Sequence, residues 1–365
     1  MAHRFLLITL LFVAVGSAGL FSSPHGSGHV NTQLDKESRA AFIQRAQIWT
    51  PSDIPSKDLK AGPEGRDAFP PNAMVTCDYA SIESHGSSRK FGCDLGNGDV
   101  VKVRYGASNV EVQGSVLATR LLWALGFVAD RVYPVRVTCR GCSSDPWHSK
   151  GRSSEQYVFS PAVIERPPLG HEMMDGSDKA DWSWRELDLV DPALGGAPVE
   201  QRDALKLLAV FMQHTDTKTQ QQRMVCAPEG FGPDGQCEKP FLFLHDVGLT
   251  FGHATVFNSS HASGVNYENW STTPVWKDPV ECVGELHKSH TGTLGNPRIS
   301  EAGRQFLASL LVQLSDRQIQ DLFEIAGVGW QLSESGEFPS HVGVANWVLT
   351  FKQKRDEIVM HHCGA

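Results

Sequence analysis

The order of strand-like and helix-like segments is the feature that most constrains how this chain of 365 residues can fold. Between residues 74 and 165, β-branched and alternating side chains predict strands, with one helix over residues 114–125 that ends at Gly126. After residue 166, apolar residues recur mainly at helical spacing. Strands first and helices later are typical of the α+β class. The predicted strands are 74–79, 90–93, 99–105, 131–138, 156–164 and 241–244, and the predicted later helices are 200–213, 300–314, 315–326 and 344–360.

The N-terminus has the layout of a secretory signal peptide over residues 1–18. An apolar run follows Arg4 and precedes three small residues, so cleavage is expected after Ala18. The alternative is an uncleaved membrane anchor, because apolar residues continue to Phe21. We expect a secreted or periplasmic protein, or one of the secretory-pathway lumen in a eukaryote, with membrane contact only if this segment is retained. Residues 19–72 are expected to form a linker or a strap with one short helix.

Export makes disulfides permissible, and the chain holds eight cysteines. One pair flanks a predicted hairpin, a second brackets a Gly- and Pro-rich loop, and a third would tie the C-terminal tail to the body. The fourth pair, Cys139 and Cys142, either closes a tight loop or forms half of a zinc site. The three pairs predicted from position are Cys77–Cys93, Cys226–Cys237 and Cys282–Cys363.

The composition and the missing motifs argue against several classes of function. The formal net charge of −8 disfavours general electrostatic binding of nucleic acid. The chain contains no G-x-x-x-x-G-K-[ST] phosphate loop and no G-x-S-x-G nucleophile elbow. His171 and Glu172 lack the second histidine of a zinc-protease helix. We therefore do not expect a P-loop nucleotide hydrolase, an α/β-hydrolase or a zinc protease of that type.

Three polar segments stand in a fixed order after predicted elements. The predicted strand at residues 99–105 carries Lys102 among valines. A segment that reads His214-Thr-Asp-Thr-Lys-Thr-Gln-Gln221 directly follows an amphipathic helix, and it matches the H-x-D-x-K-x-x-N pattern with Gln221 in the Asn position. A segment that reads His245-Asp-Val-Gly-Leu-Thr-Phe-Gly252 directly follows an apolar strand, and it contains D-x-G.

With these segments the chain resembles the protein-kinase-like superfamily, in particular its atypical HipA-type, phosphoinositide and secretory-pathway branches. The segment from Arg120 to Phe127 is similar to a helix end of HipA-type proteins, and the segment from Phe159 to Arg166 is similar to the strand and hinge between kinase lobes. The resemblance covers roughly residues 74 to 255. It implies a two-lobed α+β fold, with a small strand-rich N-lobe over residues 74–165 and a mainly helical C-lobe over residues 166–365.

The resemblance assigns roles that suit phosphoryl transfer, which needs positioning and charge neutralisation more than covalent chemistry. Asp216 would orient the acceptor hydroxyl, and Lys218 would steady the transferring phosphate. Asp246 would bind a divalent metal, with the amide oxygen of Gln221 as a second contact. The implied cofactors are ATP and Mg²⁺ or Mn²⁺.

The same resemblance places Lys102 on the nucleotide phosphates and Glu165 in the hinge segment beside the cofactor. The chain departs from the pattern where a helix glutamate should anchor the lysine, because that position is Ser115. Glu111 lies one helical turn earlier and is expected to pair with Lys102 instead. Arg104 lies on the same strand face and is the alternative phosphate contact.

The sequence therefore predicts an exported ATP- and metal-dependent kinase with an unidentified hydroxyl acceptor, which is a protein, a sugar or a lipid headgroup. The alternative is a non-catalytic kinase-like binding or scaffold protein, and a third option is an exported zinc-dependent hydrolase. Two smaller features stay open. The tail His361-His-Cys363 is either a metal site or a solvated tail, and Asn258 and Asn269 fit the glycosylation pattern of a eukaryotic secretory pathway.

Overall fold

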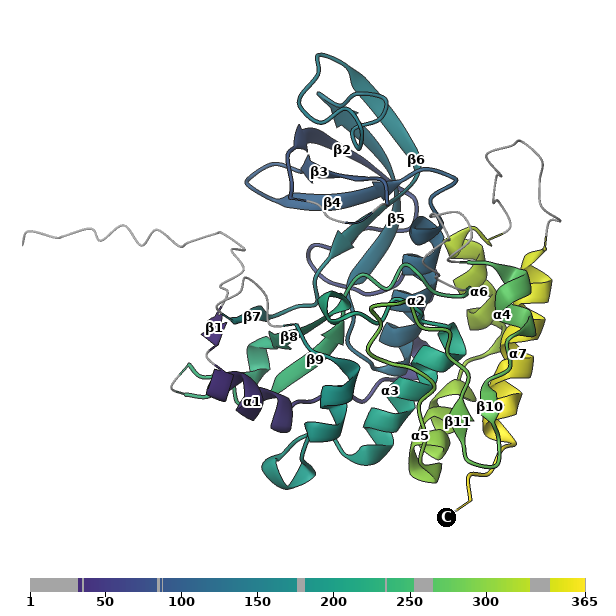
Figure 1. The fold of residues 1–365 in the computed structure, drawn as a ribbon. Helices are drawn as coiled ribbons and strands as arrows, with labels where there is room; N and C mark the ends of the chain where they lie inside the picture. The colour runs from purple at the N-terminus through teal and green to yellow at the C-terminus, as the bar shows by residue number, and fades with distance from the viewer. Residues whose placement is uncertain are drawn as a thin grey trace, which may run out of the picture.

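The computed structural model shows a mixed α and β protein (Figure 1). It describes residues 32–34, 36–83, 86, 88–175, 181–233, 235–252, 265–328 and 342–364. The predicted signal peptide and the glycosylation motif at Asn258 lie outside these residues. No helix in the described part of the chain is long and apolar enough to cross a membrane.

Five strands close into a barrel in the order β2-β3-β4-β6-β5. Alternation sends Phe91, Val101, Val103 and Ile164 to the inside, where they form a separate apolar core. The predicted turn at Asn97 and Gly98 joins β3 to β4 and sets their antiparallel register. The strands are β2 (Ala73–Ala80), β3 (Lys90–Asp94), β4 (Val100–Tyr105), β5 (Arg131–Arg140) and β6 (Gln156–Arg166), so all five predicted here are confirmed with small shifts of their ends.

Helix α2 (Val110–Leu125) connects β4 to β5 and lies between the barrel and the remaining helices (Figure 1). It begins four residues before the predicted start at Gly114, because the side chain of Asn109 caps it by accepting a hydrogen bond from the Glu111 amide. It ends at Gly126 as predicted, in the left-handed conformation with φ 88°. Because the helix begins earlier than predicted, Glu111 lies in its first turn.

The second part of the chain holds more strand than the sequence predicts. A four-stranded sheet has the order β1-β7-β8-β9, with β1 (Thr32–Leu34), β7 (His171–Asp175), β8 (Gln222–Cys226) and β9 (Pro240–Leu244). Of these only β9 was predicted, because β7 and β8 are short and lack a clear alternation. The strands β10 (Trp276–Asp278) and β11 (Val283–Gly284) form a small ribbon.

Helices form most of the remaining body below the barrel (Figure 1). Ser300 and Ser315 cap the N-termini of two of these helices through their hydroxyls. Both serines directly precede segments with apolar residues at helical spacing. These helices share one large apolar core with α2 and with the four-stranded sheet. They are α3 (Val199–Met212), the short α4 (Tyr267–Thr272), α5 (Glu301–Leu311), α6 (Asp316–Ala326) and α7 (Val344–Val359).

The segment before the barrel packs across the body. Helix α1 (Lys36–Gln44) begins it, and Ile43, Ile54 and Leu59 are buried in the large core. The Gln47 amide donates to the carbonyl of Pro240 at 2.7 Å, which ties the segment to the four-stranded sheet. Residues 36–72 therefore run as a packed strap.

All eight cysteines form disulfides in the pairs expected from position, and the fourth pair is Cys139–Cys142. The half-zinc-site hypothesis for Cys139 and Cys142 is therefore wrong, since their sulfurs are bonded to each other. The Cα atoms of the four pairs lie 5.6 to 5.9 Å apart, within the usual range. Cross-links of this number fit an oxidising compartment.

The disulfides differ in the length of chain they close, and this predicts unequal effects on stability. Cys282–Cys363 spans 81 residues and Cys139–Cys142 spans 3. Because a cross-link mainly restricts the unfolded chain, the double change Cys282→Ser, Cys363→Ser should lower the free energy of unfolding by up to about 4.5 kcal/mol. The matched change Cys139→Ser, Cys142→Ser should cost well under half of that. Chemical denaturation of both variants measures this, and an equal loss would contradict it.

Candidate functional site

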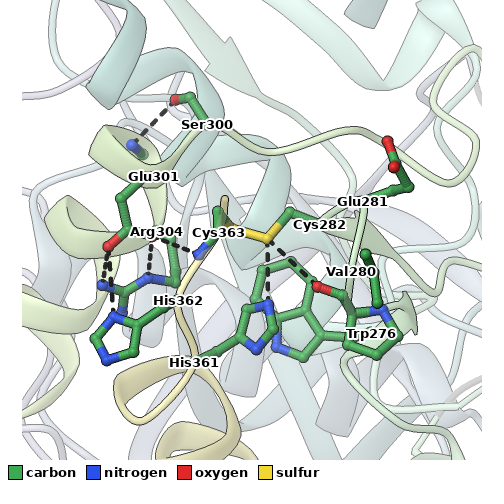
Figure 2. Close-up of a disulfide and its surroundings, with 12 residues drawn as sticks. Trp276, Val280, Glu281, Cys282, Ser300, Glu301, Arg304, His361, His362 and Cys363 are labelled. Carbon is green, nitrogen blue, oxygen red and sulfur yellow. Dashed lines mark hydrogen bonds and ion pairs between the residues drawn. A yellow bond between two sulfur atoms is a disulfide. The ribbon is translucent and has the colours of Figure 1, made fainter. Parts of the chain in front are cut away.

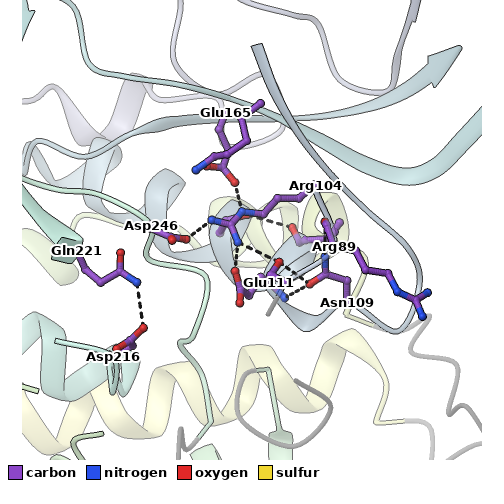
Figure 3. A network of polar contacts seen from close by, with 12 residues as sticks. Arg89, Arg104, Asn109, Glu111, Glu165, Asp216, Gln221 and Asp246 are labelled. Atoms are coloured by element: carbon purple, nitrogen blue, oxygen red, sulfur yellow. Dashed lines mark hydrogen bonds and ion pairs between the residues drawn. The ribbon is translucent and has the colours of Figure 1, made fainter. Parts of the chain in front are cut away.

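Arg104 lies at the centre of a buried network of charged side chains (Figure 3). Its Nε donates to Glu165, one terminal nitrogen donates to Glu111 and to the Ser88 hydroxyl, and the other donates to Asp246. Burial opposes the charge of the guanidinium, but Asp246 and Glu165 raise the pKa of Arg104 above its ordinary value. One residue of β4 thus binds groups from β6, α2 and the segment after β9.

Lys102 takes a different partner from the one the sequence predicts. Its ammonium pairs with Glu165 at 2.5 Å, and the two residues face each other across β4 and β6. Glu111, the expected partner, pairs with Arg104 instead. Ser115 donates to a carbonyl of its own helix, that of Val112 at 3.4 Å. The helix glutamate Glu111 therefore pairs with Arg104, and the predicted pair of Glu111 with Lys102 is wrong.

The segment after α3 gathers its polar side chains around Asp216. One carboxylate oxygen of Asp216 accepts from Lys218 at 2.8 Å. The same oxygen accepts from the amide nitrogen of Gln221 at 3.0 Å (Figure 3). The other oxygen accepts from the Ser289 hydroxyl at 3.4 Å. Within the described part of the chain, the amide oxygen of Gln221 receives no hydrogen bond, so it is available as a ligand.

The segment after β9 is held in an uncommon backbone conformation. Asp246 has φ 53°, in the left-handed region that non-glycine residues seldom adopt. Its amide donates to Asp130 at 3.1 Å, and the imidazole of His245 lies 2.7 Å from the same carboxylate. Burial raises the pKa of Asp130, but the nearby His245 outweighs this effect and lowers that pKa below its ordinary value. Asp130 therefore positions both residues through its carboxylate.

Asp246 keeps one carboxylate oxygen free of hydrogen bonds from the described residues, while the other accepts from Arg104. Burial alone would raise the pKa of this carboxyl, but Arg104 and Lys102 hold it well below its usual range. The group is therefore ionised at neutral pH and has an open oxygen. With the free oxygen of Gln221, this is a donor set of the kind that Mg²⁺ and Mn²⁺ prefer.

The structure brings the three polar segments together. The His245 amide donates to the carbonyl of Gln221 at 2.8 Å, and the Thr215 amide donates to that of Leu249 at 3.4 Å. Arg104 joins the strand segment on β4 to Asp246. Burial lowers the pKa of His214 to about 4. The negative charges of Asp216 and Asp246 both oppose that shift, so both carboxylates interact electrostatically with this imidazole.

Two glycines let helix α2 lie directly against the Asp246 segment. A Cβ on Gly114 would come within 2.0 Å of the carbonyl oxygen of Gly248. A Cβ on Gly248 would come within 2.8 Å of the Cβ of Glu111. Because neither position has room for a side chain, packing against α2 requires the D-x-G glycine.

Lys90 is a further buried cation in this region. It pairs in register with Arg104 across β3 and β4, so the two positive side chains lie on the same face of the barrel. It is 7% exposed, and no described residue forms an ion pair or hydrogen bond with its ammonium, which lies 5.7 Å from the centre of the Trp147 ring. Burial and the positive charges of Arg104 and Lys102 lower the pKa of Lys90 to about 8.

A cleft of about 1360 Å³ adjoins the network. Lys102, Glu165, Asp130 and His245 line it, together with Phe243 of β9. The β3–β4 turn and the segment that follows β6 also line the cleft, through Gly96, Asn97, Pro167, Pro168 and Gly170. The cleft is large enough for a ligand of nucleotide size.

The C-terminal tail does not form a metal site. Figure 2 shows Cys363 bonded to Cys282, with the Nε2 of His361 lying 3.2 Å from the Cys282 sulfur. Among the described residues, these three side chains lie close enough together to hold a metal ion. The disulfide bonds both sulfurs to each other, however, so neither is available as a ligand. His361 packs on Trp276 at 4.6 Å between ring centres, and the tail is a disulfide-tied surface element.

No family model matches this chain, and no curated protein matches it. Among solved structures, it is distantly similar to the crystal structure of a Helicobacter pylori proinflammatory kinase, CtkA. That similarity has a TM-score of 0.39 at 10% sequence identity, and it covers 80% of this chain and 96% of that chain.

Sequence reasoning missed Asp130 and Lys90. The Asn97-Gly98 turn could have revealed Lys90. That turn sets the register of β3 and β4, and in this register Lys90 lies directly opposite Arg104. Asp130 follows a helix and a short loop with no local motif, and only the tertiary fold brings it to His245.

Removal of Arg104 should destabilise the protein strongly at neutral pH. Arg104→Met would leave Glu111, Glu165 and Asp246 without their shared cation, which should lower the free energy of unfolding by about 3–5 kcal/mol. Since the pKa of Asp246 is lowered in the folded protein, the stability it gains from Arg104 is present above about pH 4 and is lost as the pH falls below that. The deficit of the variant should therefore shrink at pH 3.5.

The matched control is Arg140→Met, which breaks an exposed pair with Asp78. That change should alter the free energy of unfolding by less than about 1 kcal/mol at either pH. Chemical denaturation of both variants at pH 7 and pH 3.5 makes the comparison. Equal losses for the two arginines, or a deficit at Arg104 that grows in acid, would contradict the central role of this ion network.

Proposed function

We propose that this protein is an exported, ATP- and metal-dependent phosphotransferase with a two-lobed kinase-like fold, acting on a hydroxyl acceptor. The observation that carries the proposal is the position of Arg104. It lies on the third strand of the barrel and joins a glutamate of the next helix to the aspartate of a D-x-G segment. Kinases need a strand cation paired to that helix glutamate, together with a metal-binding D-x-G aspartate.

The chain order of the elements supports the proposal. The barrel strands come first with α2 inserted, the segment after β6 leads to the helical part, and the Asp216 segment and Asp246 follow in that order. The barrel and the helical part have separate apolar cores, which suits two lobes with a cleft beside their junction. The open oxygens of Asp246 and Gln221 suit a divalent metal, which when bound would neutralise phosphate charge.

The residues around the cleft suit a nucleotide and an acceptor at separate places. The cleft between the β3–β4 turn and Phe243 would take the base and sugar. Asp216 would accept or orient the proton of the acceptor hydroxyl, with Lys218 beside it to steady the transferring phosphate. The acceptor is proposed only as a hydroxyl of a protein, a sugar or a lipid headgroup. The four disulfides support export of the protein.

One observation favours the rival function, a non-catalytic kinase-like binding or scaffold protein. Arg104 and Lys102 already have carboxylate partners without any ligand, so most of the network is balanced in charge by the protein itself. A site of this kind would persist for structural reasons and would not need a nucleotide. Binding measurements separate the two functions.

Thermal unfolding with Mg·ATP or Mn·ATP tests the proposal. A ligand that binds only the folded state raises its stability by RT ln(1 + [L]/Kd), about 2.7 kcal/mol at a hundredfold excess over Kd, so the wild-type melting temperature should rise by a few degrees. Asp246→Ala should abolish the metal-dependent shift, because the phosphate charge loses its counter-charge. Asp216→Asn should keep the shift and lower the rate of phosphate transfer from ATP, since its role arises in the transition state.

The control for both variants is Asp78→Asn, an exposed position of β2 whose partner is Arg140. It should match the wild type in shift and rate. If the wild-type protein shows no shift with either metal, the catalytic proposal fails and the scaffold function replaces it. If Asp216→Asn removes the shift as fully as Asp246→Ala does, the division of roles between the two aspartates is wrong.

A further inference from the structure

Three cations, Lys90, Lys102 and Arg104, lie on the outer face of the barrel. They differ in how many carboxylate partners the protein provides. Arg104 has three carboxylate partners, and Lys102 has Glu165 at 2.5 Å. Lys90 is buried, though less completely than Arg104, and no carboxylate among the described residues contacts its ammonium. Of these three cations, Lys90 alone remains available to an anion.

The position of Lys90 is unfavourable unless an anion binds there. A buried ammonium with no carboxylate in direct contact carries a desolvation cost, and a like charge directly across the strand pair adds to it. The face of the Trp147 ring at 5.7 Å provides only a weak compensation. A methionine of similar shape would fill the same space without this cost, so stability alone does not explain the lysine.

The surroundings of Lys90 indicate where the anion would lie. A Cβ on Gly86 would stand 3.6 Å from the Lys90 nitrogen, so the backbone of this glycine lies close to the ammonium. On the other side, Asp246, Arg104, Lys102 and Glu165 all act electrostatically on Lys90, so it faces the charged network. The anion would therefore lie between Gly86 and the open oxygen of Asp246.

We propose that Lys90, and not Lys102, is the lysine that binds the phosphates of the nucleotide. This inference rests on the proposed function, because it places a phosphate-bearing ligand in the same site. Lys102 then acts as a positioning residue that holds Glu165 in the network. The binding lysine has moved to the neighbouring strand β3, and the β4 position nearest Glu111 is held by Arg104.

Equilibrium binding of Mg·ATP, adenosine and tripolyphosphate to the full chain tests this inference. Lys90→Met should weaken Mg·ATP and tripolyphosphate binding by about ten- to hundredfold, because a charge-assisted contact is lost. Adenosine binding should stay unchanged, since it lacks phosphate. The melting temperature of the variant without ligand should equal or exceed that of the wild type, which shows that the variant is folded.

The matched control is Lys150→Met. Lys150 lies over the same Trp147 ring at the same 5.7 Å but is exposed, and its loss should change no binding constant. If Lys90→Met binds Mg·ATP as the wild type does while Lys102→Met binds it weakly, the inference is overturned and the proposed function stands. A parallel loss of adenosine binding in Lys90→Met would also overturn it, because the pocket as a whole would then be disturbed.

Failure of the proposed function gives a different pattern. If the wild type binds tripolyphosphate but neither ATP nor adenosine, and Lys90→Met loses the tripolyphosphate, the nucleotide function falls and the phosphate role of Lys90 holds. If the wild type binds none of the three probes, both are overturned.

Discussion

The structure depends on one buried guanidinium. Arg104 donates to groups on β6, on α2, in the segment before β3 and in the segment after β9, so a single side chain connects the barrel to the helical part. A buried ion network of this kind costs much desolvation and is not a reliable source of stability by itself. Its directional hydrogen bonds instead restrict how the barrel can sit on α2, because a shift would separate Arg104 from Glu111 or Asp246.

The choice of arginine at this position has consequences for the neighbouring charges. A guanidinium presents five donors in a rigid planar fork, which lets it bind Glu111, Glu165 and Asp246 at once. A lysine has three donors on one atom and could not reach three carboxylates that come from different directions. Once the arginine is fully used by the protein, a phosphate needs another cation, and the uncommitted ammonium of Lys90 is directly across the strand pair.

Local signals in the sequence predicted much of the fold, and tertiary neighbours decided the rest. Strand alternation, the Asn97-Gly98 turn, serine caps and the cysteine pairs depend on residues close in sequence or on simple pairing, and the structure confirms them. The partner of Lys102 depends on β6 lying beside β4, a contact between segments about 60 residues apart that no local pattern records. The short strands β7 and β8 lack a clear alternation, and the partners of β7 are distant in the chain, so local signals did not reveal them.

The same interactions couple the position of α2 to the shape of the Asp246 segment. The left-handed backbone of Asp246 costs on the order of 1 kcal/mol or more, and the hydrogen bond from its amide to Asp130 offsets that cost from one side. From the other side, Gly114 and Gly248 bring the helix into direct contact with the same segment. A movement of α2 would therefore break the Arg104–Glu111 pair and release the Asp246 segment together. The proposed metal ligand is in place only when the helix is, so assembly of the site behaves as one step, not as a sum of independent contacts.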